Sequence, residues 1–278
     1  MAKLNFNSIK DNVLELYRRF TEDEITALSA QLSYYFLLSL FPLLIFIVSV
    51  ATYLPIDYMS LLGLLSDYMP EDVLVLIETF LNQIIESSGG GLISIGIIGT
   101  LWSASNGINA VMRALNKAYN VEENRSFIKG RLIAMSLLIS VMVIIVVAFL
   151  LPVFGQMIGV YIFSFFGVSD QFLTVWNALR WVISSFIFLV VFMYLYQMAP
   201  NTRVYFRDII FGALFSTIGW QLASYGFAFY VNEMGNYSAT YGSLGGVIVL
   251  MLWFYISGII ILLGGEINAM VAVKRGKA

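Results

Sequence analysis

The residues of this chain that could do chemistry are carboxylates, arginines, asparagines and tyrosines. The 278 residues include no His and no Cys, which excludes histidine acid–base catalysis, thiolate nucleophiles, disulfides and metal sites built on His or Cys. No glycine-rich loop followed by Lys has the spacing of a nucleotide-binding P-loop. We therefore expect no enzyme, no metal or other cofactor, and no ATP hydrolysis by this chain.

One carboxylate stands out because it closes a long apolar segment. Glu266 lies in the stretch ILLGGEINA, and the next cation along the chain is Lys274. A charge among apolar residues is costly unless a partner holds it. Lys274 is about 12 Å further along a helix, which places Glu266 near one end of a membrane span. We expect an ion pair with Arg113, with Asn109 or Asn268 completing the network.

A second group of polar residues lies in the stretch LWSASNGINAVMRALNKAYN. Asn106, Asn109, Arg113 and Asn116 recur at spacings of three, four and three, which predicts one polar stripe on a helix. Such a stripe is expected to face a cavity or another polar helix rather than lipid. Two interpretations stay open: structural contacts between helices, or a path for a solute to which Tyr237 and Tyr241 add polar lining.

The composition indicates the environment in which these residues act. Hydrophobic residues make up 60% of the chain and charged residues 12%, against about 25% charged in soluble domains. An apolar stretch of roughly 20 residues spans a bilayer as a helix. We expect a single all-α integral-membrane domain over residues 1–278 with six spans, at about 27–54, 92–116, 132–161, 173–198, 209–231 and 244–273.

The positive charges indicate how these spans are oriented. With six spans, 14 of the 15 Lys and Arg residues fall on one side, and Arg180, inside the fourth span, is the exception. Lys and Arg mark the cytoplasmic side, so both termini are expected there. The net charge is only −2, so nucleic acid is not an expected partner.

Two segments outside the spans are expected to be amphipathic helices. Residues 8–20 place apolar residues on one face, which predicts a helix that lies in the cytoplasmic interface or packs against the bundle. Residues 55–88 predict an external helical hairpin, which either covers the outer mouth of the bundle or anchors it in the interface.

Three stretches carry a family resemblance. They are SAQLSYYFLLSLFPLLIF (29–46), LWSASNGINAVMRALNKAYNVEE (101–123) and NYSATYGSLGGVIVLMLWFYISGIIILLGGEINA (236–269), and they resemble the YihY/BrkB family of bacterial inner-membrane proteins. The resemblance implies a six-span bundle in the bacterial plasma membrane. The family has carried two labels, virulence factor and ribonuclease BN. Ribonuclease activity is disfavoured here because no acids with ligand-like spacing are available.

The leading functional expectation is secondary or passive movement of a lipid or small solute in envelope maintenance. A cavity would lie between the first, second, fifth and sixth spans, with Arg113 and Glu266 as its inner charged network. Membrane lipids are the expected partners. The rival expectation is a membrane scaffold that transports nothing and binds a partner protein.

Overall fold

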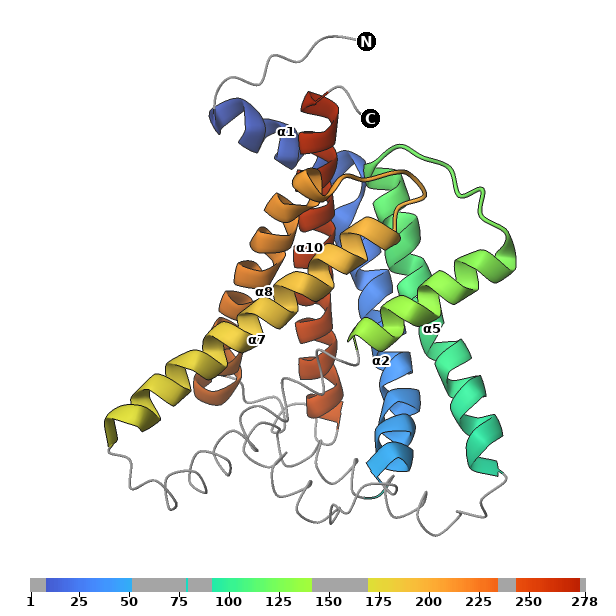
Figure 1. The fold of residues 1–278 in the computed structure, drawn as a ribbon, viewed down its shortest axis with the longest axis vertical. Helices are drawn as coiled ribbons and strands as arrows, with labels where there is room; N and C mark the ends of the chain where they lie inside the picture. Colours follow the sequence, from blue (N-terminus) through green and yellow to red (C-terminus); the bar gives the residue numbers. More distant parts are fainter. Residues whose placement is uncertain (1–8, 52–78, 80–91, 142–169, 235–243, 276–278) are drawn as a thin grey trace.

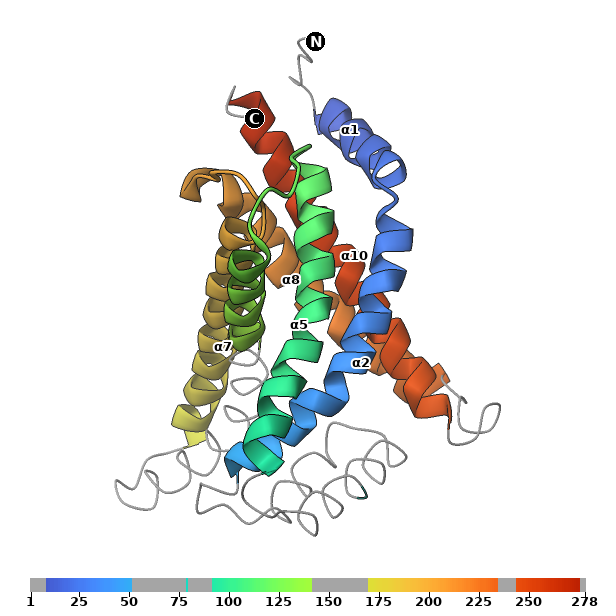
Figure 2. The same ribbon diagram turned by 90° about the vertical axis from the view of Figure 1, so that its right-hand side faces the viewer.

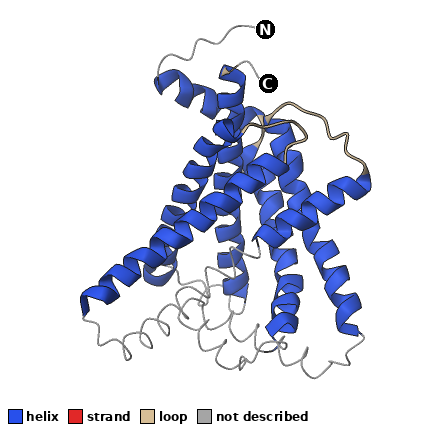
Figure 3. Ribbon diagram, viewed as in Figure 1, coloured by secondary structure: helices blue, strands red, loops and turns tan. Residues whose placement is uncertain are grey.

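The described part of the chain is helical. The computed structural model describes residues 9–51, 79, 92–141, 170–234 and 244–275, and no strand occurs among them (Figure 3). The named helices are α1 (Ile9–Glu22), α2 (Ile25–Ala51), α5 (Leu92–Ala118), α7 (Asp170–Met198), α8 (Phe206–Met234) and α10 (Gly245–Lys274). A further helix covers residues 127–141. The all-α expectation is confirmed for these residues.

Helix α10 lies at the centre of the bundle. It packs against α8 on one side and α2 on the other, and it also contacts α5 and α1. Helix α5 packs mainly on α2, while α7 lies across α8 (Figures 1 and 2). The start of α1 and the end of α10 lie at the same end of the molecule (Figure 1). We call this end, with the loops over 119–126 and 199–205, the basic end.

Small residues let α8 and α10 approach closely. A Cβ atom added to Gly264 would clash with the Ser216 hydroxyl, the Tyr196 hydroxyl and the Gly212 carbonyl. A Cβ added to Gly212 would clash with the Gly264 carbonyl and with Asn268. Small residues at helix–helix contacts are typical of membrane bundles, where close backbone packing drives association. Gly264 of α10 and Gly212 of α8 therefore fix the spacing of these two helices.

Hydroxyl and indole groups also join α7, α8 and α10, on the side of these glycines towards the start of α10. The Tyr196 hydroxyl donates to the Ile261 carbonyl at 2.7 Å and lies 2.6 Å from the Ser216 hydroxyl. The Trp220 indole N–H donates to Ser257 at 3.1 Å, and the Trp253 indole N–H donates to Ser224 at 3.2 Å. Each of these polar groups is hydrogen-bonded to a group on another helix, so they act as structural contacts between helices.

The six expected spans are only partly tested. Among the described residues, one helix, Gly245–Lys274, is both long enough and apolar enough to cross a bilayer. Its most apolar stretch has a mean hydropathy of 2.6. Helices α2, α5, α7 and α8 match the expected first, second, fourth and fifth spans to within a few residues, but six crossings stay a prediction. Most of the expected third span (132–161) and of the external hairpin (55–88) lies outside the described residues, as does Tyr237.

Candidate functional site

Glu266 is paired, and its partner comes from the N-terminal helix. The Arg19 guanidinium of α1 donates to the Glu266 carboxylate at 3.2 Å and to the Ala118 carbonyl, at the end of α5, at 3.3 Å. The Glu266 side chain is 1% exposed and the Arg19 side chain 13%. Asp23, in the turn after α1, also interacts with the Glu266 carboxyl group. Arg19 therefore connects α1, α5 and α10 at the basic end.

The expected pairing of Glu266 with Arg113 is wrong. The Arg113 side chain is exposed, and among the described residues the ion pair of Glu266 is made by Arg19. Arg113 and Glu266 both lie near the basic-end termini of their helices, but a similar depth does not fix which way a side chain points around a helix. The charged network is built from α1 and α10 rather than from α5 and α10.

Glu15 completes the arrangement around Arg19. Its carboxylate accepts from Arg19 at 2.9 Å and from Arg18 at 2.7 Å. Burial raises the pKa of Glu15, but the hydrogen bonds and charges of the two arginines outweigh burial, so the pKa lies below its usual range. These contacts turn Glu15 and Arg19 towards the bundle, while Arg18 stays half-exposed. Val13, Leu14 and Tyr17 are left exposed, as in a helix lying in a membrane interface.

The expected stripe on α5 divides into two rows. Asn106 and Arg113 are both exposed, and seven residues of helix return to the same face. Asn109 is half-buried and Asn116 is buried, about 60° around the helix from the first row. The spacing of three, four and three therefore describes an exposed row and an inward row. We call Asn106 and Arg113 the exposed row of α5.

The exposed row meets a cation from the helix over residues 127–141. The Arg131 guanidinium donates to the Asn106 carbonyl oxygen at 3.0 Å. Asn106 precedes the end of α5 at Ala118 by roughly 18 Å of helix, so this polar contact lies well inside the length of α5. The chain folds back from the 119–126 loop to reach that depth (Figure 1).

Asn116, in the inward row of α5, binds the loops of the basic end. The Asn116 side chain accepts from the Asn201 backbone N–H at 2.6 Å and donates to Glu123 at 2.8 Å. The Asn201 side chain donates to the Glu122 carbonyl at 2.7 Å and accepts from Arg125 Nε at 3.1 Å. Asn116 and Asn201 thus join the 119–126 loop to the loop after α7.

Asn268 is a structural contact between α10 and α8. Its side-chain oxygen accepts from the Gly212 backbone N–H at 2.7 Å, and both residues are buried. One helical turn before Gly212, buried Asp208 accepts from Arg275 at the end of α10. Tyr237 and Tyr241, which were expected to add polar lining, lie outside the described residues.

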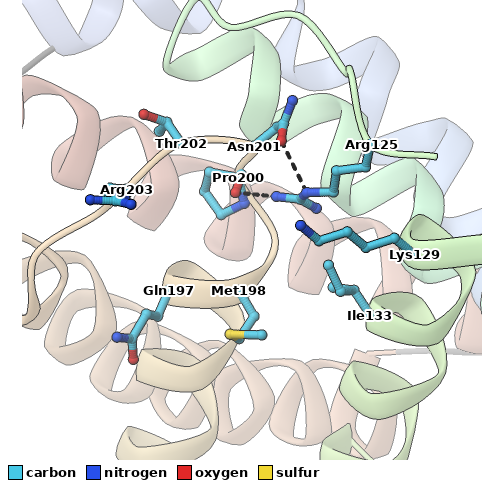
Figure 4. Close-up of a pocket in the computed structure, with 9 residues that line it drawn as sticks. All are labelled: Arg125, Lys129, Ile133, Gln197, Met198, Pro200, Asn201, Thr202 and Arg203. Carbon is cyan, nitrogen blue, oxygen red and sulfur yellow. Dashed lines mark hydrogen bonds between the residues drawn. The ribbon is translucent and has the colours of Figure 1, made fainter.

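A pocket of about 320 Å³ opens between the two loops that Asn201 joins. Arg125 and Lys129 reach it from the chain after α5, and Thr202 and Arg203 from the loop after α7 (Figure 4). Its lining contains three cations and no acid. This pocket was not predicted from the sequence. The available signal was the clustering of cations in two loops assigned to the same side of the membrane.

The described residues offer no metal centre. No group of three or more carboxylates is close enough there to hold a metal ion. The buried acids Glu15, Asp208 and Glu266 are each engaged by an arginine.

Comparison with known proteins gives consistent matches along the chain. The family described as virulence factor BrkB matches residues 16–278. A ribonuclease-like protein, YfkH, of Bacillus subtilis is 52% identical, covering 94% of this chain and 95% of that protein. A UPF0761 membrane protein of Pseudoalteromonas translucida is 29% identical, covering 93% and 85%. Another, of Photobacterium profundum, is 27% identical, covering 94% and 80%. No solved structure matches.

Proposed function

The chain belongs to the BrkB family of membrane proteins, and from this premise we propose that it moves a lipid or small solute across the bacterial plasma membrane by a passive or secondary mechanism. One observation carries the proposal. The exposed row of α5 presents an amide and a guanidinium on a helix of 27 residues, far from its ends in the case of Asn106. Polar side chains at membrane depth usually face water-filled paths rather than acyl chains.

The contact between Asn106 and Arg131 supports the same interpretation. Arg131 brings a second guanidinium to the depth of Asn106, and Arg113 lies two turns nearer the basic end on the same face. A polar headgroup or solute leaving the basic end would meet Arg113 and then Asn106 on the surface of α5, while Arg131, itself buried, holds the Asn106 amide. The proposed path therefore follows the surface of α5, and Glu266 is not part of it because Arg19 already neutralises that carboxylate.

The scaffold alternative rests on a different observation. Tyr196, Ser216 and Asn268 use their polar groups to hold helices together, and so they require no solute. Both interpretations share the same packed centre at α8 and α10. They differ only in whether the exposed row of α5 touches water or a substrate.

Nuclease chemistry is not part of the proposal, although YfkH carries a ribonuclease-like name. Hydrolysis of RNA needs acid–base groups or metal-binding carboxylates. This chain has no His, and the described acids form no metal-binding group.

Reconstitution into liposomes tests the proposal. We expect purified protein to accelerate the exchange of fluorescent phospholipid between leaflets, or the efflux of a small solute, over that of empty liposomes. Replacing the exposed row (Asn106→Leu with Arg113→Leu) should abolish the acceleration, whereas Arg207→Ala, an exposed cation elsewhere at the basic end, should retain it. No acceleration of either process by folded protein would support the scaffold alternative.

A further inference from the structure

The pocket at the basic end has the chemistry of an anion site. Its volume of about 320 Å³ falls at the lower end of the range for small-ligand sites, roughly 300–1,000 Å³. Lys129 and Arg203 face it from opposite sides, one from the helix over 127–141 and one from the loop after α7 (Figure 4). An anion between them would gain from both charges.

Arg125 has a different role from these two cations. Three of its N–H groups are used by Asn201 and by the carbonyls of Ala199 and Pro200, and Glu123 lies 3.8 Å away. It is therefore a positioning residue that holds the two loops together. By contrast, no ion pair is recorded for the Lys129 ammonium or the Arg203 guanidinium among the described residues, and both side chains are exposed.

The first turn of the helix over residues 127–141 lies beside the pocket, because its residue Lys129 lines it. The Lys129 backbone N–H is already used by the Ser126 hydroxyl, so the anion-binding groups of the pocket are its side-chain cations. The positive end of a helix dipole favours an anion nearby.

Apolar side chains occur in this cationic pocket and near it: Ile133 and Met198 line it. Phe127, Ile128 and Leu132 lie close to Lys129 in the sequence and are exposed, as are Tyr205 and Phe206, which lie close to Arg203 in the sequence. A small soluble anion gains nothing from exposed apolar side chains near its site. A phospholipid does, because its acyl chains can pack against them while its phosphate binds the cations. Basic pockets beside membrane helices are known to suit anionic lipid headgroups.

We propose that Lys129 and Arg203 bind the phosphate of an anionic phospholipid, with Thr202 as an additional hydroxyl donor and the exposed apolar residues against its acyl chains. The shared chemistry is a phosphate ester, and the lipid is the source to which the geometry points. This inference goes beyond the proposed function, because binding requires no movement of lipid across the bilayer and is measured without flux.

The test uses the full chain, purified in a neutral detergent and stripped of native lipid. Binding of short-chain phosphatidylglycerol is titrated by intrinsic tryptophan fluorescence or calorimetry, alongside short-chain phosphatidylcholine and soluble glycerol phosphate. The variant Lys129→Gln with Arg203→Gln removes the two contact cations. The matched control, Lys117→Gln with Arg207→Gln, removes two exposed cations of the same end that do not line the pocket.

We expect phosphatidylglycerol to bind more tightly than phosphatidylcholine, and the pocket variant to weaken this binding about tenfold or more, since each cation near an anionic lipid contributes on the order of 1 kcal/mol. The control variant should bind like the unmodified protein. Equal binding by the pocket variant and the control would overturn the site. Glycerol phosphate binding as tightly as the lipid, and with the same sensitivity to the pocket variant, would overturn the lipid assignment.

Discussion

Arg19 of α1 and Glu266 of α10 form a buried ion pair at 3.2 Å that joins residues 247 positions apart in the chain. The Glu266 carboxylate is tolerated in the apolar helix α10 because the Arg19 guanidinium pairs with it. It also holds the N-terminal helix against the bundle, because Glu15 lies on the other side of the same guanidinium.

Breaking this pair should destabilise the protein strongly. Replacing Arg19 with Gln leaves the Glu266 carboxylate buried with no countercharge, and loss of one partner of a buried pair typically costs about 3–5 kcal/mol. Replacing Arg18, whose side chain is 51% exposed, should cost about 1 kcal/mol or less. Thermal unfolding in detergent measures both effects.

A double-mutant cycle identifies the partner of Glu266. Glu266→Gln should restore much of the stability lost in Arg19→Gln, because the unpaired charge is then absent. It should not interact energetically with Arg113→Gln. Additive effects of Arg19→Gln and Glu266→Gln, or coupling to Arg113 instead, would refute the ion pair.

Gly264 should tolerate no side chain. Alanine there places a Cβ against the Ser216 and Tyr196 hydroxyls and the Gly212 carbonyl, and overpacking costs about 1–3 kcal/mol or more. Gly226 of α8 is the matched control because nothing lies within 4 Å of an added Cβ. Gly226→Ala should be neutral or stabilise by up to about 1 kcal/mol. Equal melting temperatures for the two variants would contradict the close packing of α8 on α10.

Docking of α1 should weaken in acid. The pKa of Glu15 lies below its usual range, so its ionised form contributes stability that is complete above the unfolded-state pKa, about 4.3. This contribution is lost as the pH falls through the lower, folded-state pKa. The stability difference between the unmodified protein and Glu15→Gln should therefore be constant above about pH 5 and shrink below the unfolded-state pKa. A stability difference that grows on acidification would show that the pKa of Glu15 is not lowered in the folded protein.

Asn201→Ala should loosen the loops of the basic end while leaving the helices intact. Its side chain joins Glu122, Asn124 and Arg125, and these bonds hold the 119–126 loop. Hydrogen exchange should accelerate in that loop and stay unchanged in α10. Thr202→Ala, in an exposed neighbouring position, serves as the control. Unchanged exchange in the 119–126 loop of Asn201→Ala would argue against this role.

The helices were predictable from the sequence because each apolar run is long enough to cover a span. The expected fifth span, 209–231, corresponds to α8 at Phe206–Met234, for example. The partner of Glu266 was not predictable in the same way. Arg19 lies in a helix that was expected either in the interface or packed against the bundle, and only the tertiary fold shows that its side chain reaches Glu266 of α10.

The polar stripe shows a similar limit. Its period correctly predicts a helix, but the single stripe is wrong, because a spacing of three residues leaves about 60° between Asn106 and Asn109. That angle separates an exposed position from a half-buried one. The bonds of Asn116 to Asn201 and Glu123 depend on loop conformation, for which the sequence contains no periodic signal.

Water access to the exposed row of α5 tests the proposed path most directly, and the absence of Cys from the chain makes the measurement clean. Single variants Asn106→Cys and Arg113→Cys are treated in proteoliposomes with a membrane-impermeant thiol reagent, beside Leu222→Cys, at an apolar position of α8 that is 68% exposed. We predict that the two α5 variants react and the α8 variant does not. An Asn106→Cys variant as unreactive as Leu222→Cys would place this row against acyl chains and contradict the path.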